Sequence, residues 1–210
     1  MNPYEIIATL YDPIFEPLSR VLKDVGASMC PPQPGLDVLD VGCGTGTMLE
    51  RYVVGGCRVA GVDASAAMLE VARQRLGPSG RLILGDASVM PFDDDAFDLV
   101  TFTMVLHELD PGTRAAVVRE ALRVLRPGGQ MLVIDYHVGP LLFPRGWLQR
   151  GFTTFVERIA GRAHYRGFRH FVTHGAIPGL AAAHGLRVEA RRVMAQGNFA
   201  IFVLRHGRSS

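Results

Sequence analysis

The strongest constraint on the fold is a regular alternation of short apolar runs with segments of helical spacing. The apolar runs are rich in β-branched residues and are bounded by glycine and aspartate, which is typical of buried strands. They occupy residues 36–41, 57–63, 81–85, 97–103 and 130–136. Helical spacing follows at 45–53, 66–75 and 111–125. Since crossovers between parallel strands are right-handed, this pattern predicts a parallel sheet with helices on both faces.

The last part of the chain departs from this alternation. A helix predicted over 177–183 leads into two strand-like runs, LRVEARRV and FAIFVLR, joined by MAQGN. A link this short favours a hairpin, so the sheet should end in an antiparallel pair. We therefore predict an α/β fold with a mostly parallel seven-stranded sheet. A length of 210 residues suits one domain with one core.

Composition excludes several classes of protein. A formal net charge of +2 is too small to indicate a nucleic-acid partner. The three cysteines form no CxxC pair, so we expect reduced thiols. No apolar run reaches the roughly 18 residues of a membrane span, and the first residues resemble no signal peptide. These features predict a cytoplasmic protein.

The most informative segment is VLDVGCGTG at 38–46, a strand followed by a glycine-rich turn and a helix. Glycines at 42, 44 and 46 let the backbone turn tightly and approach a ligand, and the helix start favours an anion. A dinucleotide site of the G-x-G-x-x-G type requires glycine at 47, where this chain has Thr47. The pattern therefore fits a smaller ligand whose carboxylate meets the turn.

Acids follow the second and third predicted strands. Asp63 lies 19 residues beyond Gly44, near the distance at which an acid accepts hydrogen bonds from ribose hydroxyls. The alternative is that Asp63 caps the helix that starts near Ser65. Asp86 occupies the same relative place after the third strand and can accept from an adenine amino group; otherwise it is a solvated loop acid.

These residues resemble the class I S-adenosylmethionine-dependent methyltransferases, in particular the group similar to the ubiquinone and menaquinone biosynthesis enzymes. The resemblance covers about 36–136. It rests on four segments in the family's order, VLDVGCGTG, GVDASAAMLEVAR, GDASVMPFDDDAFDLVTFTMVLHEL and VLRPGGQMLVID. It implies a Rossmann-like sheet and S-adenosyl-L-methionine as the cofactor.

The resemblance also implies a set of cofactor-binding residues. They are Tyr11, Asp40, Gly42, Cys43, Gly44, Thr45, Gly46, Asp63, Ala64, Met68, Asp86, Ala87 and Thr103. Asp40 and the glycine turn would hold the methionine moiety, with Thr103 beside it, and Asp63 would hold the ribose. Asp86 and the Ala87 backbone would contact the adenine, with Met68 nearby. Tyr11, in YDPIFEP, would belong to a cover over the cofactor, for which Tyr4 is a weaker candidate.

Methyl transfer from a sulfonium needs little from side chains beyond holding donor and acceptor in line in a dry pocket. An acceptor that must lose a proton needs a base, and His107, just past the fourth strand, is the candidate catalytic residue. The alternative is a histidine that only shapes the pocket. Tyr136 and His137, at the end of the fifth strand, are candidates for the acceptor side.

Residues 141–170 form an apolar and basic insertion. Leu148, Phe152, Phe155, Val156 and Ile159 share one helical face. Six arginines accompany a single acid, Glu157. We expect a lid whose apolar face closes the pocket; the alternative is peripheral contact with an anionic membrane. His164, His170 and His174 have no carboxylate or cysteine near them in this segment's pattern, so no metal is expected.

The sequence thus predicts a methyltransferase with a small, lipophilic methyl acceptor, either a quinone-type carbon or an amine or hydroxyl. The alternatives are a phospholipid N-methyltransferase at the membrane surface and a non-catalytic S-adenosylmethionine-binding protein. Within one domain we expect a cover segment (1–35), a cofactor-binding core (36–137), a lid or substrate insertion (138–175) and a last helix with the strand hairpin (176–210). No nucleic-acid partner is expected.

Overall fold

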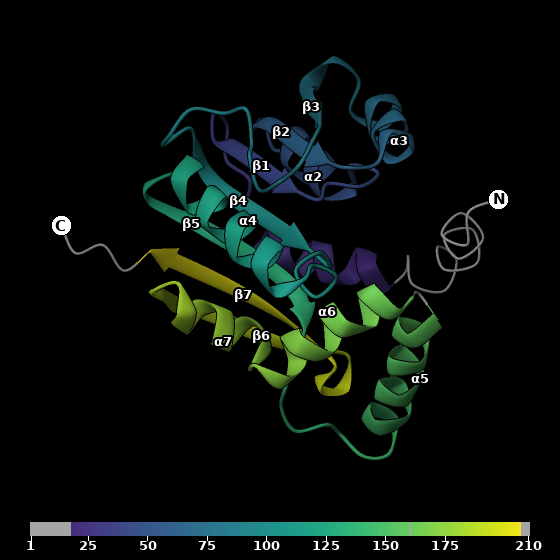
Figure 1. Cartoon of the computed structure of the whole chain (residues 1–210). Helices are drawn as coiled ribbons and strands as arrows, with labels where there is room; N and C mark the ends of the chain where they lie inside the picture. The colour runs from purple at the N-terminus through teal and green to yellow at the C-terminus, as the bar shows by residue number, and fades with distance from the viewer. Residues whose placement is uncertain (1–17, 160, 207–210) are drawn as a thin grey trace.

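The structure, a computed structural model, describes residues 18–159 and 161–206. One seven-stranded sheet runs through it in the order β3-β2-β1-β4-β5-β7-β6 (Figure 1). The strands are β1 (Asp37–Val41), β2 (Arg58–Asp63), β3 (Gly80–Leu84), β4 (Phe97–Thr103), β5 (Leu125–Tyr136), β6 (Leu186–Met194) and β7 (Phe199–His206). The pairs among β1 to β5 are parallel, whereas β7 runs antiparallel to both β5 and β6. The predicted α/β fold and antiparallel ending are confirmed.

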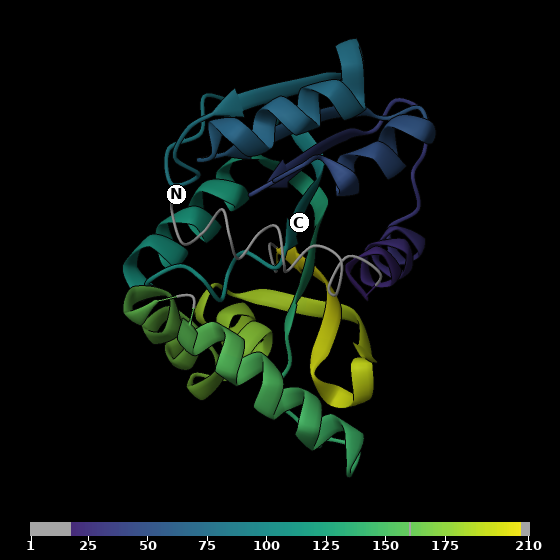
Figure 2. The same cartoon turned by 90° about the vertical axis from the view of Figure 1, so that its right-hand side faces the viewer.

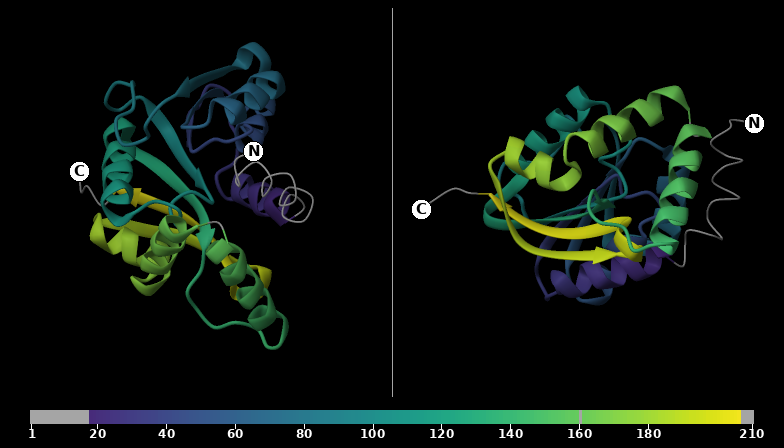
Figure 3. Two further views of the ribbon diagram at one scale, coloured as in Figure 1. Left: turned by 45° about the vertical axis from the view of Figure 1, so that its right-hand side comes forward. Right: turned by 90° about the horizontal axis from the view of Figure 1, so that it is seen from below.

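Helices cover both faces of the sheet. They are a first described helix at 18–29, α2 (Thr47–Val54), α3 (Ala66–Leu76), α4 (Pro111–Val124), α5 (Arg145–Ile159), α6 (Arg162–Thr173) and α7 (Ala176–Ala183), with 3-10 turns η1 (Gly77–Ser79) and η2 (Ala195–Gly197). The helix at 18–29 and α2 lie on one face, and α4, α6 and α7 lie on the other (Figures 1 and 3). No helix in 18–159 or 161–206 is long and apolar enough to cross a bilayer.

The core follows from the strand sequences. Most positions of the inner strands β1, β4 and β7 are buried, as is the second half of β5 from Met131 to Tyr136, whereas β6 at the edge is largely exposed. This arrangement brings the carboxyl ends of β1, β2 and β4 to one edge of the sheet, where open α/β sheets bind their ligands.

Two boundaries differ from the prediction. Helix α2 begins at Thr47 rather than residue 45, because Gly46 adopts a left-handed φ of 76°. Strand β5 begins at Leu125, directly after α4, rather than at residue 130, and therefore includes the RPGG segment between the predicted helix and strand. A shift in register between Phe97 and Leu99 of β4 accommodates these extra residues.

The insertion forms α5 and α6, which lie beyond the ends of β4 and β5 (Figures 1 and 2). The orientation of α5 is the reverse of the expected one. Its buried positions are Gly146, Thr153 and Glu157, whereas its large apolar side chains face outward. The exposed apolar side chains of α5 and the preceding loop are Leu142, Phe143, Trp147, Leu148, Phe152, Phe155 and Ile159.

Candidate functional site

The glycine turn 42–46 connects β1 to α2, and its three glycines adopt the left-handed backbone conformation that glycine favours. Gly42, Gly44 and Gly46 have φ values of 70°, 51° and 76°. A Cβ added at Gly42 would lie 2.4 Å from Val105 Cγ2, whereas one added at Gly44 would meet nothing within 4 Å. Packing therefore requires glycine at 42, while Gly44 leaves open space in which a ligand can approach the backbone.

Asp63, at the end of β2, is tied to this turn. Its Oδ2 accepts a hydrogen bond from the Gly44 N–H at 2.8 Å, and its Oδ1 accepts one from the Ser65 N–H at 2.8 Å. The residue that caps α3 is Ser65, whose Oγ accepts from the Met68 N–H. Asp63 is therefore not the helix cap, and each of its half-buried oxygens can accept a further hydrogen bond.

The residues expected near the adenine lie at the neighbouring strand ends. The Gly85 N–H donates to the Asp63 carbonyl at 3.1 Å, which places the loop after β3 beside Asp63. Asp86 is exposed, and hydrogen bonds from Ser88 hold its pKa below the usual value. Met68 and Ala64 are also exposed, and Ala87 is half-buried. The parallel sheet thus gathers the predicted ribose and adenine residues at one edge.

Asp40 lies beneath the turn and is only 1% exposed. Its Oδ1 accepts a hydrogen bond from Thr101 Oγ1 at 2.6 Å. Burial raises the pKa of this carboxyl to about 7, although the Thr101 hydrogen bond and the charge of Lys23 oppose the rise. Lys23 reaches the same region from the first described helix, with Nζ 2.5 Å from Thr47 Oγ1. A further cationic group near Asp40 would stabilise its charged form.

The end of β4 adjoins the turn on its other side. Val105 packs against Gly42, as described above, and Thr103 lies two residues earlier on the chain. Thr103 Oγ1 is buried without a hydrogen-bond partner among the residues that the structure describes. Because an unpaired buried hydroxyl is costly, this atom fits a polar group of a ligand in the crevice. Together with the open space at Gly44, it agrees with a cofactor bound along this edge. Tyr11 and Tyr4 lie outside the described residues.

His107 lies in a buried polar cluster rather than at an open pocket wall. Its ring is T-shaped to that of Tyr136, and its side chain is 3% exposed. Nδ1 lies 2.7 Å from Asp135 Oδ1, and Nε2 lies 3.7 Å from Glu157 Oε1 and 3.9 Å from Glu108 Oε1. Burial by itself lowers the pKa of His107, but the neighbouring carboxylates, Asp135 first, raise it to about 9.

Glu157 links this cluster to the insertion. Its Oε1 accepts a hydrogen bond from the Tyr136 hydroxyl at 2.7 Å, and its Oε2 is paired with His164 Nε2. Burial would raise the pKa of Glu157, but the hydrogen bond from His164 and the charge of His107 hold it below the usual value. Sequence reasoning missed Asp135 and Glu157 as site residues. The available signal for Asp135 was its position at the carboxyl end of a strand, like that of Asp63.

The three histidines of the insertion are not brought together. His170 and His174 stack on one another with ring centroids 3.8 Å apart, whereas His164 meets Glu157 and the His107 ring. The expectation that no carboxylate lies near these histidines was therefore wrong. The expectation was based on the spacing of the histidines in the sequence. The packing of α6 against α5, which brings His164 to Glu157, could not be read from that spacing.

The insertion is fixed to the sheet by polar contacts. Arg150 donates to Asn198 Oδ1 at 2.8 Å and to the His137 carbonyl at 2.6 Å. Arg114 binds the carbonyls of Leu106 and Gly167, which joins the loop after β4 to α6. Arg150 is thus part of the structure, whereas Arg145, Arg158, Arg162, Arg166 and Arg169 are exposed.

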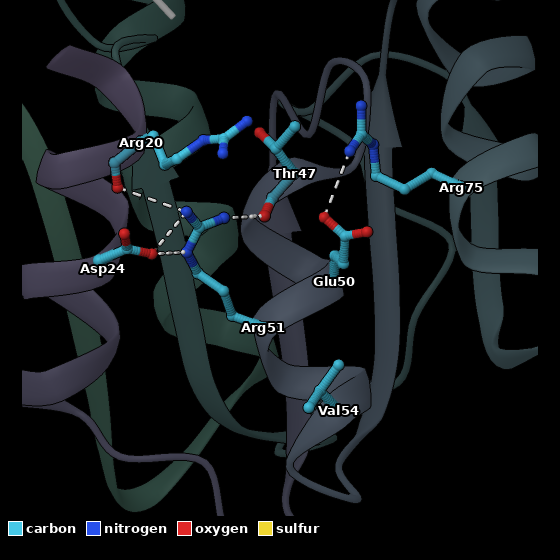
Figure 4. Close-up of a pocket in the computed structure, with 7 residues that line it drawn as sticks. All are labelled: Arg20, Asp24, Thr47, Glu50, Arg51, Val54 and Arg75. Carbon is cyan, nitrogen blue, oxygen red and sulfur yellow. Dashed lines mark hydrogen bonds and ion pairs between the residues drawn. The ribbon is translucent and has the colours of Figure 1, made fainter. Parts of the chain in front are cut away.

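A cavity of about 610 Å³ lies between the first described helix and α2, with Arg75 from α3 at its rim (Figure 4). Four of its five charged side chains are paired with one another. Arg51 lies 2.6 Å from Asp24, and Arg75 lies 3.2 Å from Glu50. Arg75 also donates to the Thr45 carbonyl of the glycine turn at 2.9 Å. The lining therefore supports the back of the turn.

The fold and this edge of the sheet are shared with known proteins. Residues 38–129 match the family described as a methyltransferase domain. A crystal structure of an S-adenosylmethionine-dependent methyltransferase from Aquifex aeolicus superposes with a TM-score of 0.66 at 18% identity, over 97% of this chain and 98% of that one. The match over 38–129 and the shared fold support the class I S-adenosylmethionine-dependent methyltransferase that the sequence motifs predicted.

Among curated proteins, the chain is similar to two demethylmenaquinone methyltransferases. That of Clavibacter sepedonicus is 34% identical over 131 residues, which are 61% of this chain and 51% of the relative. That of Renibacterium salmoninarum is 41% identical over 103 residues, 49% of this chain and 42% of the relative. The chain therefore spans about half the length of the curated relatives it matches.

Proposed function

We propose that this protein transfers a methyl group from S-adenosylmethionine to a lipophilic ring acceptor of the quinone type. The observation that carries the choice of acceptor is the exposed apolar surface of α5 and its preceding loop, beside the strand ends. The names of the curated relatives support the same class of acceptor. In this proposal, residues 36–137 bind the cofactor and residues 138–175 bind the acceptor.

When bound, the cofactor supplies an electrophilic methyl group on a sulfonium. The glycine turn and Thr103 would position the methionine end, and Asp40 would provide a buried negative charge near it. Asp63 would accept hydrogen bonds from the ribose, and Asp86 with Ala87 would meet the adenine. Rate enhancement then comes mainly from orientation in a site from which water is excluded.

A general-base role for His107 does not form part of this proposal. The ring is buried, its Nδ1 is bonded to Asp135, and its Nε2 faces two glutamates. His107 is better described as a positioning residue that fixes the loop after β4. Tyr136 and His137 are buried as well, so they would support the residues around the acceptor rather than contact it directly.

We further propose that the exposed face of α5 meets an anionic bilayer and collects the acceptor there. Large apolar side chains on one face with arginines beside them are typical of helices that lie in a membrane interface. Glu157, the single acid of the segment, is buried in the cluster, so its charge does not offset that of the arginines at the surface. This proposal replaces the expected lid, whose apolar face would have pointed inward.

The experiment that tests the function measures S-adenosylhomocysteine formation by the purified protein. The acceptor panel holds demethylmenaquinone in anionic vesicles, a short-chain water-soluble quinol, and a phosphatidylethanolamine vesicle without quinone. We expect turnover with the two quinone-type acceptors. Turnover with the phospholipid alone would instead establish the N-methyltransferase alternative. Tight cofactor binding with no turnover on any acceptor would support the non-catalytic alternative.

A vesicle sedimentation assay tests the bilayer contact. Wild type should sediment with anionic vesicles and less so at high salt, since each arginine near such a surface contributes about 1 kcal/mol. The triple reversal Arg145→Glu, Arg158→Glu and Arg162→Glu should abolish sedimentation. The matched control reverses Arg73, Arg119 and Arg192, which are exposed elsewhere on the molecule, to glutamate. Equal loss in both triple variants would show a general charge effect and reject the α5 surface.

A further inference from the structure

The cluster formed by His107, Glu157 and His164 has a composition that methyl transfer does not require. One ligand-type atom from each residue lies within 4.8 Å of the others. His107 and Glu157 are buried and His164 is half-buried. The three residues come from the loop after β4, from α5 and from α6, so the cluster joins three separate elements at one point.

We propose that His107, Glu157 and His164 bind a divalent first-row transition-metal ion, for which Zn²⁺ is the best match. Two imidazoles and one carboxylate are ligands that Zn²⁺ uses in proteins, with water or a further carboxylate in the fourth position. Glu108 Oε1, 3.9 Å from His107 Nε2, is the further carboxylate at hand.

The neighbours of the cluster are arranged as those of metal ligands are. Asp135 accepts from His107 on two sides, with Oδ1 2.7 Å from Nδ1 and Oδ2 3.2 Å from the backbone nitrogen. This fixes the ring so that Nε2 faces Glu157. A carboxylate bonded to the distal nitrogen of a histidine is the usual support of a metal ligand. The Tyr136 hydroxyl orients Glu157 in the same way, through Oε1.

One of the ligand distances is already close to that of a tetrahedral site, and the others need an adjustment of His164. Ligand atoms about 2.0–2.2 Å from a tetrahedral ion are roughly 3.3–3.6 Å apart from one another. His107 Nε2 and Glu157 Oε1 are 3.7 Å apart. The contact between His164 and Glu157 is a direct hydrogen bond, which the ion would replace once the His164 side chain rotates toward His107.

The charges of the cluster also suit a dication. Three carboxylates, those of Asp135, Glu108 and Glu157, surround the two histidines. This concentration of acidic side chains around two imidazoles favours a dication. Because metal ligands must be deprotonated, binding of the ion should release protons.

The proposal goes beyond the proposed methyl transfer, because the ion would act on the insertion rather than on the cofactor. It would link α5 and α6 to the ends of β4 and β5 and so fix the position of the exposed apolar surface. Binding to the folded state alone would also raise the melting temperature.

The test uses the full chain freed of metal with a chelator that is then removed. Equilibrium dialysis measures Zn²⁺ binding, and Co²⁺ titration reports the ligand field by absorption. We expect one ion per chain, and at least about 100-fold weaker binding in His164→Gln and in Glu157→Gln. His174→Gln, on the exposed end of α6, is the matched control and should bind as wild type does.

Two results would overturn the proposal. One is that the wild type binds neither Zn²⁺ nor Co²⁺ at about 100 µM, a concentration well above the dissociation constant expected of a protein zinc site. The other is an unchanged Zn²⁺ affinity in His164→Gln. This variant is the more decisive one, because position 164 is half-buried and tolerates substitution better than the buried position 157. S-adenosylmethionine binding, measured on the same samples, reports whether each variant is folded. Failure of methyl transfer would leave the metal result intact, so the two proposals can fail separately.

Discussion

The glycine turn beside β1 and β2 is held by main-chain hydrogen bonds, whereas α5 is attached to the sheet by buried polar side chains. In the first region, the N–H groups of Gly42 and Cys43 donate to the Val62 carbonyl, and the apolar strands fill the core. In the second, Glu157 and Thr153 face inward while Phe152 and Phe155 face outward. The first region buries apolar side chains, as expected of a folded domain. In the second region, polar side chains are buried and large apolar side chains are exposed.

The difference shows that the two regions meet different requirements. The turn depends on backbone conformation and tolerates no added side chain at Gly42. The insertion depends on pairing between charged groups, which stabilises little in net terms but is costly to break. Substitutions should therefore affect the insertion most strongly at its polar positions and the turn most strongly at its glycines.

The largest effect should come from Glu157→Ala. Removal of this carboxylate takes away the acceptor of the Tyr136 hydroxyl, the partner of His164 and a negative charge 3.7 Å from His107 Nε2. We expect a loss of about 3–5 kcal/mol in the free energy of unfolding, measured by urea denaturation. Phe155→Ala, two residues away but exposed, should change it by less than about 0.5 kcal/mol. A larger loss from Phe155→Ala would break the comparison, because α5 would then bury its apolar face.

At the turn, Gly42→Ala should cost about 2–4 kcal/mol, because the new Cβ combines a positive φ with a clash against Val105. Gly44→Ala should cost only about 1 kcal/mol of stability, for the positive φ alone, since its Cβ meets no described atom. Calorimetry should nevertheless show that both variants lose cofactor binding. Normal affinity in Gly44→Ala would mean that the cofactor does not approach the turn.

Asp63→Ala tests whether Asp63 binds the cofactor or only supports the glycine turn. We expect cofactor binding to weaken by about 2–3 kcal/mol, or roughly thirty- to two-hundred-fold in Kd, as the ribose loses charge-assisted hydrogen bonds. The melting temperature should also fall, because the N–H groups of Gly44 and Ser65 lose their acceptor. If only the melting temperature changes and Kd does not, Asp63 serves structure alone.

Asp40→Asn should have the smallest effect and the opposite sign. The pKa of Asp40 is raised to about 7 in the folded state, so ionisation destabilises the fold as pH rises from about 4 to 7. Asparagine does not ionise, and its Oδ1 can still accept from Thr101. We expect a gain of about 1–2 kcal/mol at pH 8, reduced by the buried amide protons, and none near pH 4. A pH-independent difference would contradict a raised pKa.

The predictable part of the molecule was the part in which chain order determines position. Parallel strands carry Asp40, Asp63 and Asp86 to one edge, so strand ends and glycine spacing were sufficient to bring them together. The pairing of Glu157 with His107 was not accessible, because it depends on how α5 packs against α6 beyond the end of β5. The apolar face of α5 pointed to the wrong orientation, since hydrophobic periodicity identifies a face but not what covers it.

The position of β7 has a consequence for the order of events during synthesis. Residues 199–206 are made after β6, yet they occupy the place between β5 and β6. Until they emerge from the ribosome, β5 presents an open edge of apolar backbone, and β6 has no partner within the sheet. The nascent chain therefore carries an aggregation-prone edge from the completion of β5 until its seventh strand closes the sheet.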